Sequence, residues 1–500
     1  PQELLVNGDK LAFQKPTVLG GDYIYGLDGT WVAWKHDPAG DGVIAADGDH
    51  VYLYGGMRRG GKNVFALDVT SVRKSSASVA PKLLWAIEGG KAGTVYEHMG
   101  QSWSTPLSRW VRWNGERRRV IFFGGGYDDV VHDDTQAFTA ASHKGRQVYM
   151  VDAVTGKLLW WASGDAVADT EVPDMQYSIT AQLITLDRNG NGVVDGLYAV
   201  DLAGQIFRFD FDEAAAAPEG SLPGDATDRL VAAKFVRNNA AATVAKLGAT
   251  ATGASTTLDN RRFYDAPGVA FVRSTAGGDL LLGVVSGYRE KPLDNATQEM
   301  AVMVRDVGAW NMTPPSRAAL TLADLTDATA LAELSAAQLE GPGWYINFQR
   351  FRTDGSPLAE KGIGSPVFFN FALLYTTFVP YGSPSASTCT PDVGYSRLYV
   401  VNALTSAGLV NAALDNVSDN QRYLDEAMPG IGSTIQLLYS GGELTLIAGT
   451  LAMGTSDGVD SDGDGVPDQL GIEGGPEESR RLTREVFGDI RRTRWFQMNE

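Results

Sequence analysis

The sequence is poor in cysteine, in long apolar runs and in basic residues. Among its 500 residues there is one cysteine, Cys389, so no disulfide can form within the chain. No apolar run reaches the roughly 20 residues that a membrane-spanning helix needs. The most apolar stretch, residues 367–380, is shorter and carries Asn370, Thr376 and Thr377. We therefore expect no membrane-spanning segment in this chain.

Basic residues are outnumbered by acidic ones, 42 to 60, which gives a formal net charge of -18. This balance argues against a nucleic-acid ligand, whose phosphates need basic patches, and against docking on anionic lipid. It suits an exported protein that binds cations. The chain begins Pro-Gln-Glu, with no initiator methionine or signal peptide, so we expect a processed or partial chain.

One pattern recurs along the chain: a short apolar strand, an Asp or Asn, a turn, and a second apolar run. Alternating apolar residues predict half-buried strands. The Asp or Asn side chain caps such a turn through the backbone, and glycine supplies the positive φ. The recurrences lie at residues 23–30, 64–70, 148–160, 197–209 and, more weakly, 398–405.

A second kind of segment alternates with these hairpins, namely a buried strand that runs into glycines. Examples are residues 120–127 and 281–288, while 102–106 and 364–367 have the character of innermost-strand starts. Repeated four-stranded units of this kind predict an all-β fold, a β-propeller of about seven antiparallel blades. We expect one domain over residues 1–500, with loop insertions at 213–228 and 240–258 and short helices within 316–339.

The sharpest chemical motif is the acidic loop 460–468. Acidic residues stand at loop positions 1, 3, 5 and 9, and Gly465 stands at position 6, where calcium-binding loops reverse sharply. Four carboxylates this close would repel one another without a cation. The pattern predicts a calcium (Ca2+) site whose ligands are Asp460, Asp462, Asp464, the carbonyl of Val466, and Asp468. The alternative is an Asp-rich turn exposed to solvent.

A second loop, 187–195, has the same spacing, with Asn at positions 3 and 5. Amide oxygens also coordinate calcium, but two carboxylates attract it less than four do. Arg188 lies inside this loop, so we expect the weaker calcium affinity here, in the range suited to extracellular calcium. A plain hairpin turn rich in Asn and Gly is the alternative. Neither loop has the flanking helices or the position-12 glutamate of an EF-hand.

The surroundings of the second loop resemble a known family. The run ITLDRNGNGVVDGLYAVDLAGQIFRFD at 184–210 is similar to the signature of the PilY family of type IV pilus proteins. Further similar motifs follow in the order of that family. They are residues 51–70, QSWSTP at 101–106, GGGYD at 124–128, and residues 148–160, 364–380 and 397–405.

The resemblance implies a propeller that forms the C-terminal half of a larger exported protein, located at the pilus tip or the cell surface. It implies roles in pilus assembly, twitching motility, adhesion and surface sensing, with minor pilins and a host or abiotic surface as partners. Calcium in the loop at 187–195 would tune pilus extension against retraction. The implied ligands are Asp187, Asn189, Asn191, the carbonyl of Val193, and Asp195. The resemblance does not extend to the loop at 460–468.

The resemblance implies a binding protein, and we expect no enzymatic activity. The main enzyme alternative is a pyrroloquinoline quinone dehydrogenase, because such calcium-containing propellers have similar hairpins. The adjacent cysteine pair that covers the quinone in those enzymes is missing, since Cys389 stands alone. A scaffold propeller that assists outer-membrane assembly is a further alternative.

Two smaller clusters have a chemical and a plain interpretation. Asp128, Asp129, His132, Asp133 and Asp134 could bind a transition metal, and we interpret them as a solvated loop after a buried strand. The basic residues Arg58, Arg59 and Lys62 lie among glycines, so they could hold an anion or form a turn.

Overall fold

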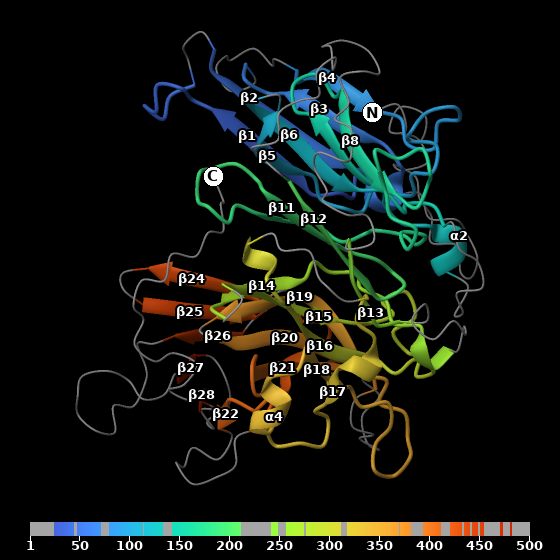
Figure 1. Cartoon of the computed structure of the whole chain (residues 1–500), viewed down its shortest axis with the longest axis vertical. Helices are drawn as coiled ribbons and strands as arrows, with labels where there is room; N and C mark the ends of the chain where they lie inside the picture. Colours follow the sequence, from blue (N-terminus) through green and yellow to red (C-terminus); the bar gives the residue numbers. More distant parts are fainter. Residues whose placement is uncertain are drawn as a thin grey trace. The chain divides into compact units, whose positions relative to one another are not determined.

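The chain forms two compact units in the computed structural model (Figure 1). The first consists of Pro1–Leu202 and Ile206–Thr243, and the second of Ala203–Gln205 and Val244–Glu500. The structure describes residues 25–44, 48–71, 80–113, 115–133, 143–211, 242–248, 257–274, 277–311, 318–369, 371–381, 394–411, 421–432, 435–440, 443–448, 451–454, 471–473 and 481–482.

The first unit contains antiparallel sheets whose strands are neighbours in chain order. One sheet has the order β1-β2-β3-β4, the next has β5-β6-β7-β8 with the short β9 parallel to β8, and a third contains β10-β11-β12. In the described part of this unit, the short helices η1 (Arg58–Gly60) and α2 (Asp129–His132) lie between strands. The strands are β1 (Trp31–His36), β2 (His50–Gly56), β3 (Val64–Asp68), β4 (Lys82–Ile87), β5 (Leu107–Trp113), β6 (Glu116–Gly124), β7 (Val148–Asp152), β8 (Leu158–Ser163), β9 (Thr170–Glu171), β10 (Ile184–Leu186), β11 (Gly196–Val200) and β12 (Gln205–Asp210).

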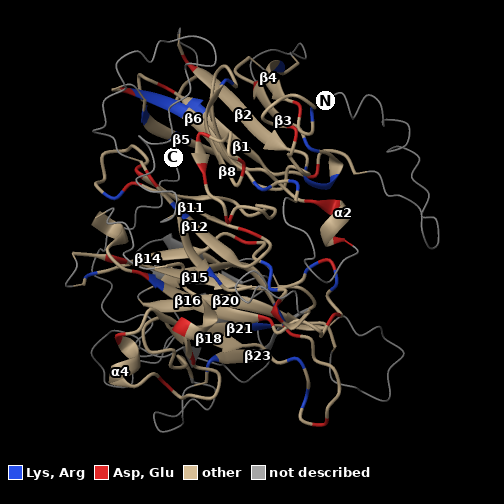
Figure 2. Ribbon diagram, turned by 45° about the vertical axis from the view of Figure 1, so that its right-hand side comes forward, with Lys and Arg blue, Asp and Glu red and all other residues tan. Residues whose placement is uncertain are grey.

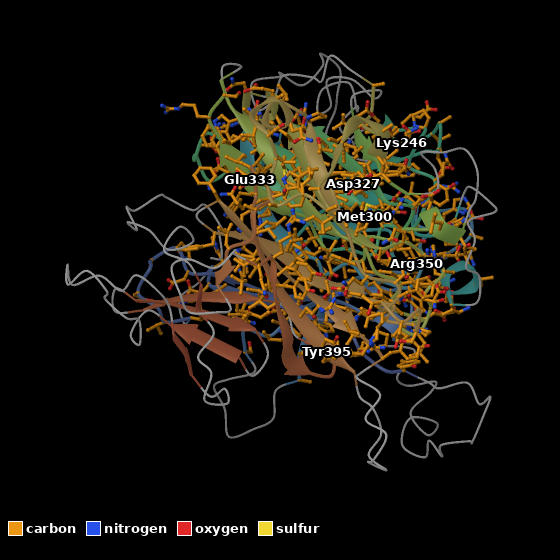
Figure 3. All side chains as sticks on the ribbon, turned by 90° about the horizontal axis from the view of Figure 1, so that it is seen from below. Lys246, Met300, Asp327, Glu333, Arg350 and Tyr395 are labelled. Carbon is orange, nitrogen blue, oxygen red and sulfur yellow. The ribbon has the colours of Figure 1, made fainter. Side chains whose placement is uncertain are left out.

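The second unit also consists of sheets in which most paired strands are antiparallel, while β17 pairs parallel with β18. Its sheets have the orders β14-β15-β16-β18-β17, β19-β20-β21-β23 and β24-β25-β26-β27, and β22 pairs with β28. The strands are β13 (Thr243–Lys246), β14 (Gly268–Val272), β15 (Asp279–Val285), β16 (Met300–Asp306), β17 (Thr326–Asp327), β18 (Gly343–Asn347), β19 (Lys361–Phe369), β20 (Ala372–Val379), β21 (Tyr395–Asn402), β22 (Val410–Asn411), β23 (Tyr423–Pro429), β24 (Gln436–Ser440), β25 (Glu443–Ala448), β26 (Leu451–Gly454), β27 (Gly471–Glu473) and β28 (Arg481–Leu482). Figure 3 shows side chains of this unit, including Met300 at the start of β16.

The predicted Asp-capped turns are present in both units. Between β7 and β8, the Asp152 Oδ1 accepts hydrogen bonds from the backbone N–H of Val154 and of Thr155, at 3.0 and 2.8 Å. After β21, the Asn402 Oδ1 accepts equivalent hydrogen bonds, both 3.0 Å long, from the backbone N–H of Leu404 and of Thr405. Each turn ends on a left-handed residue, Gly156 (φ 70°) or Ser406 (φ 61°). The turn chemistry predicted at 148–160 and 398–405 is therefore confirmed.

A tryptophan from the preceding sheet donates a hydrogen bond to each of these turns. Trp85 of β4 donates its indole N–H to the carbonyl of Ala153, at 2.9 Å. Trp344 of β18 donates in the same way to the carbonyl of Ala403, at 2.8 Å. In each unit a buried aromatic side chain thus ties one sheet to the turn of the next, and its polar N–H finds the partner that burial requires.

The cores lie between the faces of neighbouring sheets. In the first unit, Trp160, Phe122 and Phe207 belong to one cluster, and Tyr149 and Phe123 belong to another. In the second unit a cluster forms around Trp344 and the stacked pair Tyr375 and Tyr399. The strands β7 and β15 are buried on both faces, and for this reason their sequences are nearly continuous apolar runs.

Some local predictions are wrong. The insertion predicted at 240–258 contains β13, and the first recurrence, as far as it is described from residue 25, forms no strand before β1. By contrast, the short helices predicted within 316–339 are present as the single helical turns η7 (Leu322–Asp324) and α4 (Ala336–Leu339), although β17, which lies between them, was not predicted. The insertion predicted at 213–228 and Cys389 lie outside the described residues.

The all-β prediction is confirmed, while the single domain over 1–500 and the number of blades stay predictions. Among the helices of the described residues, none has the length and apolar character needed to cross a bilayer.

Candidate calcium-binding loop

The loop at 187–195 connects β10 to β11 in the first unit. The two strands pair antiparallel, with Leu186 opposite Gly196, and the Asp195 N–H donates to the Leu186 carbonyl at 2.9 Å. The Val194 N–H donates to the carbonyl of Trp110 on β5, at 2.8 Å. Both ends of the loop are therefore fixed by backbone hydrogen bonds to strands.

Asp187, at the first position, organises the loop around its carboxylate. Its Oδ1 accepts the N–H groups of Gly190 and Asn191 at 2.7 and 3.1 Å, and its Oδ2 accepts the N–H of Gly192 at 2.7 Å. Gly190 and Gly192 adopt φ values of 71° and 81°, which side chains with a Cβ rarely reach. The backbone consequently wraps around the Asp187 side chain.

The two asparagines continue the same geometry. The Asn189 Oδ1 accepts the N–H of Asn191 at 3.0 Å, and the Asn191 Oδ1 accepts the N–H of Val193 at 2.8 Å. Such side chain to backbone turns bend alternate side chains over the loop. The structure therefore brings Asp187, Asn189 and Asn191 into one compact turn.

Asp195, at the ninth position, is buried and bound to Arg188. Its Oδ2 accepts the backbone N–H of Arg188 at 2.9 Å, and its Oδ1 lies 3.3 Å from the Arg188 Nη1. The other guanidinium nitrogen, Nη2, donates to Asp210 of β12 at 2.5 Å, and Asp210 also accepts from the Arg208 Nε at 3.0 Å. Four alternating charges therefore lie in a row beneath the loop.

These residues fit a calcium ion. The donors are carboxylate, amide and main-chain oxygens, which calcium prefers, and they stand at the spacing of known calcium loops. In the described part of the chain, no three His, Cys, Asp or Glu side chains come together to hold a metal. This loop would therefore depend on Asn189, Asn191 and the Val193 carbonyl in addition to its two carboxylates.

The second predicted loop, 460–468, lies outside the described residues, and its ligands Asp460, Asp462, Asp464, Val466 and Asp468 stay predictions.

Part of the acidic segment after β6 is buried. Asp128 and His132 are buried, and Asp128 accepts the Lys144 N–H at 2.9 Å. Asp133 receives both Nη atoms of Arg59, at 2.9 and 3.0 Å, and the Tyr127 hydroxyl at 2.6 Å. The interpretation as a solvated loop is wrong for Asp128 and His132, because the segment folds into α2, visible in Figure 2 as an acidic turn.

The basic group 58–62 is likewise engaged within the fold. Arg59 is paired with Asp133, and the Arg58 guanidinium lies 4.6 Å from the centre of the Trp103 ring. Burial, together with the nearby Lys144, lowers the pKa of Lys62. The turn interpretation therefore accounts for Arg58 and Arg59, with Arg58 in a left-handed conformation at φ 47°.

Sequence reasoning noted Arg188 only as a positive charge in the loop and missed its partner Asp210. The signal was present as the Arg-Phe-Asp end of β12, residues 208–210, but spacing alone does not reveal which strand Arg188 reaches.

Comparisons with known proteins point to one family. Residues 8–256 match the PilY1 beta-propeller domain family. The type IV pilus biogenesis factor PilY1 homolog of Xylella fastidiosa is 24% identical over 389 residues, which cover 73% of this chain and 22% of the relative. The type IV pilus biogenesis factor PilY1 of Pseudomonas aeruginosa is 30% identical over 161 residues, 32% of this chain and 11% of the relative. The chain thus spans about a fifth or less of the length of these curated relatives.

A solved structure agrees in fold. The crystal structure of the Pseudomonas aeruginosa PilY1 C-terminal domain matches with a TM-score of 0.51 and 18% identity, over 84% of this chain and 83% of that domain. The predicted β-propeller fold is therefore confirmed. The chain belongs to the PilY1 β-propeller family.

Proposed function

We propose that this chain is the calcium-binding propeller of a type IV pilus biogenesis factor. The observation that carries the proposal is the loop at 187–195. It lies within the region that matches the family, and its Asp and Asn side chains already form the turns of a calcium loop.

The chain's own residues supply the binding geometry. Asp187, Asn189 and Asn191 would hold the ion with side-chain oxygens from alternate positions, the Val193 carbonyl would add a main-chain oxygen, and Asp195 would add a second carboxylate. A bound calcium ion would supply a divalent charge that draws these oxygens together. Because both loop ends belong to strands, calcium occupancy would stiffen the β10–β11 hairpin and its contact with Trp110.

The proposed biological role follows from the family. Calcium occupancy would regulate pilus extension against retraction, and through it twitching motility, surface adhesion and surface sensing. The partners would be minor pilins at the pilus tip and a host or abiotic surface. The protein would be exported and lie at the cell surface or the pilus tip, or in the periplasm or at the outer membrane. We propose a binding role and no catalytic one, since the named relatives are biogenesis factors.

The loop at 460–468 would be a second and tighter calcium site. It offers four carboxylates and no basic residue, whereas 187–195 offers two carboxylates and Arg188. Charge count tunes calcium affinity over orders of magnitude in such loops.

Calorimetric titration with calcium tests the proposal. We expect the Asp464→Ala variant to retain one binding site and the double variant Asp464→Ala/Asp187→Ala to retain none. Asp152→Ala is the matched control, because Asp152 forms the same kind of turn between β7 and β8 without a loop of oxygen ligands. It should leave calcium binding unchanged.

A cellular arm tests the regulatory role. Asp195→Ala in the full-length protein should change pilus number or twitching, while Asp152→Ala at equal protein level should not. Calcium binding that survives Asp187→Ala in the Asp464→Ala background would contradict the site. Unchanged pilus behaviour in Asp195→Ala cells would contradict its regulatory role.

A further inference from the structure

We infer that Arg188 is a built-in counter-cation of the calcium loop, which holds Asp195 when no metal is bound and lowers the affinity of the loop for calcium. The inference rests on the proposed function and adds to it a residue that sets the affinity. Arg188 is not a metal ligand, and its role is to position Asp195 and to compensate its charge.

The first support is the burial and order of the charges. Arg208, Asp210, Arg188 and Asp195 alternate in sign, and their side chains are 2%, 8%, 3% and 2% exposed. A buried carboxylate without a counter-charge is strongly unfavourable, so Asp195 needs a cation beside it. Arg188 supplies that charge from within the loop itself.

The second support is the close approach of the Arg188 guanidinium to Gly196. A Cβ added to Gly196 would lie 2.5 Å from the Arg188 Nη2 and 2.8 Å from its Cζ. The guanidinium in this position therefore occupies the space that a side chain at residue 196 would take. The residue directly after the ninth loop position thus leaves room for Arg188 as it is placed beside Asp195 and Asp210.

The third support is that Arg188 has two carboxylate partners. Its Nη1 contacts Asp195, and its Nη2 donates to Asp210 at 2.5 Å. When calcium takes the Asp195 carboxylate, Arg188 keeps Asp210 on β12, so no guanidinium is left without a partner. The calcium state of the loop would then be reflected in the Arg188 contacts that join β11 to β12.

The charges of the two candidate loops differ accordingly. Asp187 and Asp195 contribute two negative charges and Arg188 one positive charge, a net of minus one, whereas 460–468 carries minus four. A divalent ion at 187–195 is therefore bound against a fixed positive charge in a buried setting, where screening by water and salt is weak.

Calcium titration of charge variants tests the inference, with Asp464→Ala as the background so that the ion counted belongs to this loop. Arg188→Gln should bind calcium about tenfold more tightly, because charge count governs affinity in these loops. Its melting temperature without calcium should fall, and the rise on adding calcium should exceed that of the background. Asp210→Asn should act in the opposite direction and weaken calcium binding, since Arg188 then bears on Asp195 alone.

Arg117→Gln is the matched control. Arg117 donates to the Gly192 carbonyl of the same loop at 3.2 Å, but it is exposed to solvent, so its charge is screened. Its removal should change the calcium dissociation constant by less than about twofold. If Arg188→Gln fails to fold without calcium, the direction of the change in calcium affinity in Asp210→Asn tests the inference instead.

The outcomes separate the inference from the proposed function. Calcium binding by the background with equal or weaker affinity in Arg188→Gln, or equal or tighter affinity in Asp210→Asn, overturns the inference and leaves the calcium site standing. Binding by Arg188→Gln but not by the background supports the inference and overturns the calcium role of the natural loop. Absence of binding in the background and in every variant overturns both.

Discussion

Asp152 and Asn402 each shape a turn with one side-chain oxygen, because an Asp or Asn side chain reaches the backbone two or three residues ahead of it. Asp187, Asn189 and Asn191 act in the same way within the loop at 187–195. Arg188 differs from them, because its partner Asp210 is the last residue of the next strand pair.

Glycines in left-handed conformations offer a residue-scale prediction. Gly126 (φ 105°) lies so that an added Cβ would be 2.1 Å from the Gln101 carbonyl oxygen, whereas Gly115 (φ 83°) has nothing within 4 Å. Gly115→Ala should cost about 1–2 kcal/mol of unfolding free energy for the backbone conformation alone. Gly126→Ala should cost at least about 1–3 kcal/mol more for the steric overlap. Chemical denaturation of the two variants checks this, and equal losses would contradict it.

The buried carboxylate of Glu360 gives a second prediction for a single residue. Its oxygens accept from Arg397 at 2.7 Å, Thr377 at 2.7 Å and Tyr399 at 2.8 Å, and its side chain is fully buried. Glu360→Gln leaves Arg397 without its counter-charge and should cost about 3–5 kcal/mol. Glu88→Gln, which breaks an exposed pair with Lys91, should cost less than about 1 kcal/mol in the same denaturation experiment. A small loss in Glu360→Gln would mean that the pair contributes little.

At the scale of elements, the strands beside a repeated turn were predictable. Their short apolar runs located β7, β8, β11 and β12, although these strands are almost fully buried rather than half-buried. The helical spacing within 316–339 located the short helices η7 and α4 but not β17 between them, where Ala328 and Leu334 belong to the core of the second unit. β13 was missed because it follows a polar, alanine-rich stretch that carries no turn signal.

The hairpin of β1 and β2 predicts a dependence of stability on pH. His50 faces His36 across the strands, stacks on Tyr52 with ring centres 4.1 Å apart, and touches Trp34. Burial lowers the pKa of His50, and the neighbouring His36 lowers it further, although Asp49 and Asp68 and the Gly48 carbonyl oppose this. The folded state therefore favours the neutral ring.

The sign follows from that direction. A pKa that is lower in the folded than in the unfolded state stabilises the protein above the unfolded value of about 6.5, and this stabilisation is lost as the pH falls through the folded pKa. The melting temperature should thus fall between about pH 6.5 and 5, and less steeply in His50→Phe, which keeps a ring at this position. His98→Gln, at an exposed site, should follow the wild-type curve. A parallel His50→Phe curve would rule out this contribution.

At the scale of the whole chain, the propeller architecture was predictable because its hairpin recurs. The repeat can be recognised even where blades differ in length. The division into two compact units was not, because it depends on contacts between residues far apart in sequence. The candidate calcium loop was located by its spacing and by the family resemblance, but the pairing of Arg188 with Asp210 emerged only from the fold.

Removal of calcium should act on the first unit, which carries the loop at 187–195. Calcium at about 100 times its dissociation constant should stabilise the folded state by about 2.7 kcal/mol. Hydrogen exchange should therefore slow at β10 and β11 when calcium replaces a chelator, in the Asp464→Ala background. Magnesium, which prefers a smaller and more regular shell, should have less effect. Equal exchange with and without calcium would contradict the prediction.

The turns around Asp187 also bear on how fast such a site responds. Because these backbone hydrogen bonds are present without an ion, calcium binding at the proposed site would need no folding step and would proceed at about 10⁸ M⁻¹ s⁻¹. With a dissociation constant of about 10⁻⁴–10⁻³ M, as in extracellular modules, a calcium ion would stay for roughly 10–100 microseconds. The calcium occupancy of such a site on a surface appendage would then follow the surrounding calcium concentration within a fraction of a millisecond. It would not depend on earlier concentrations.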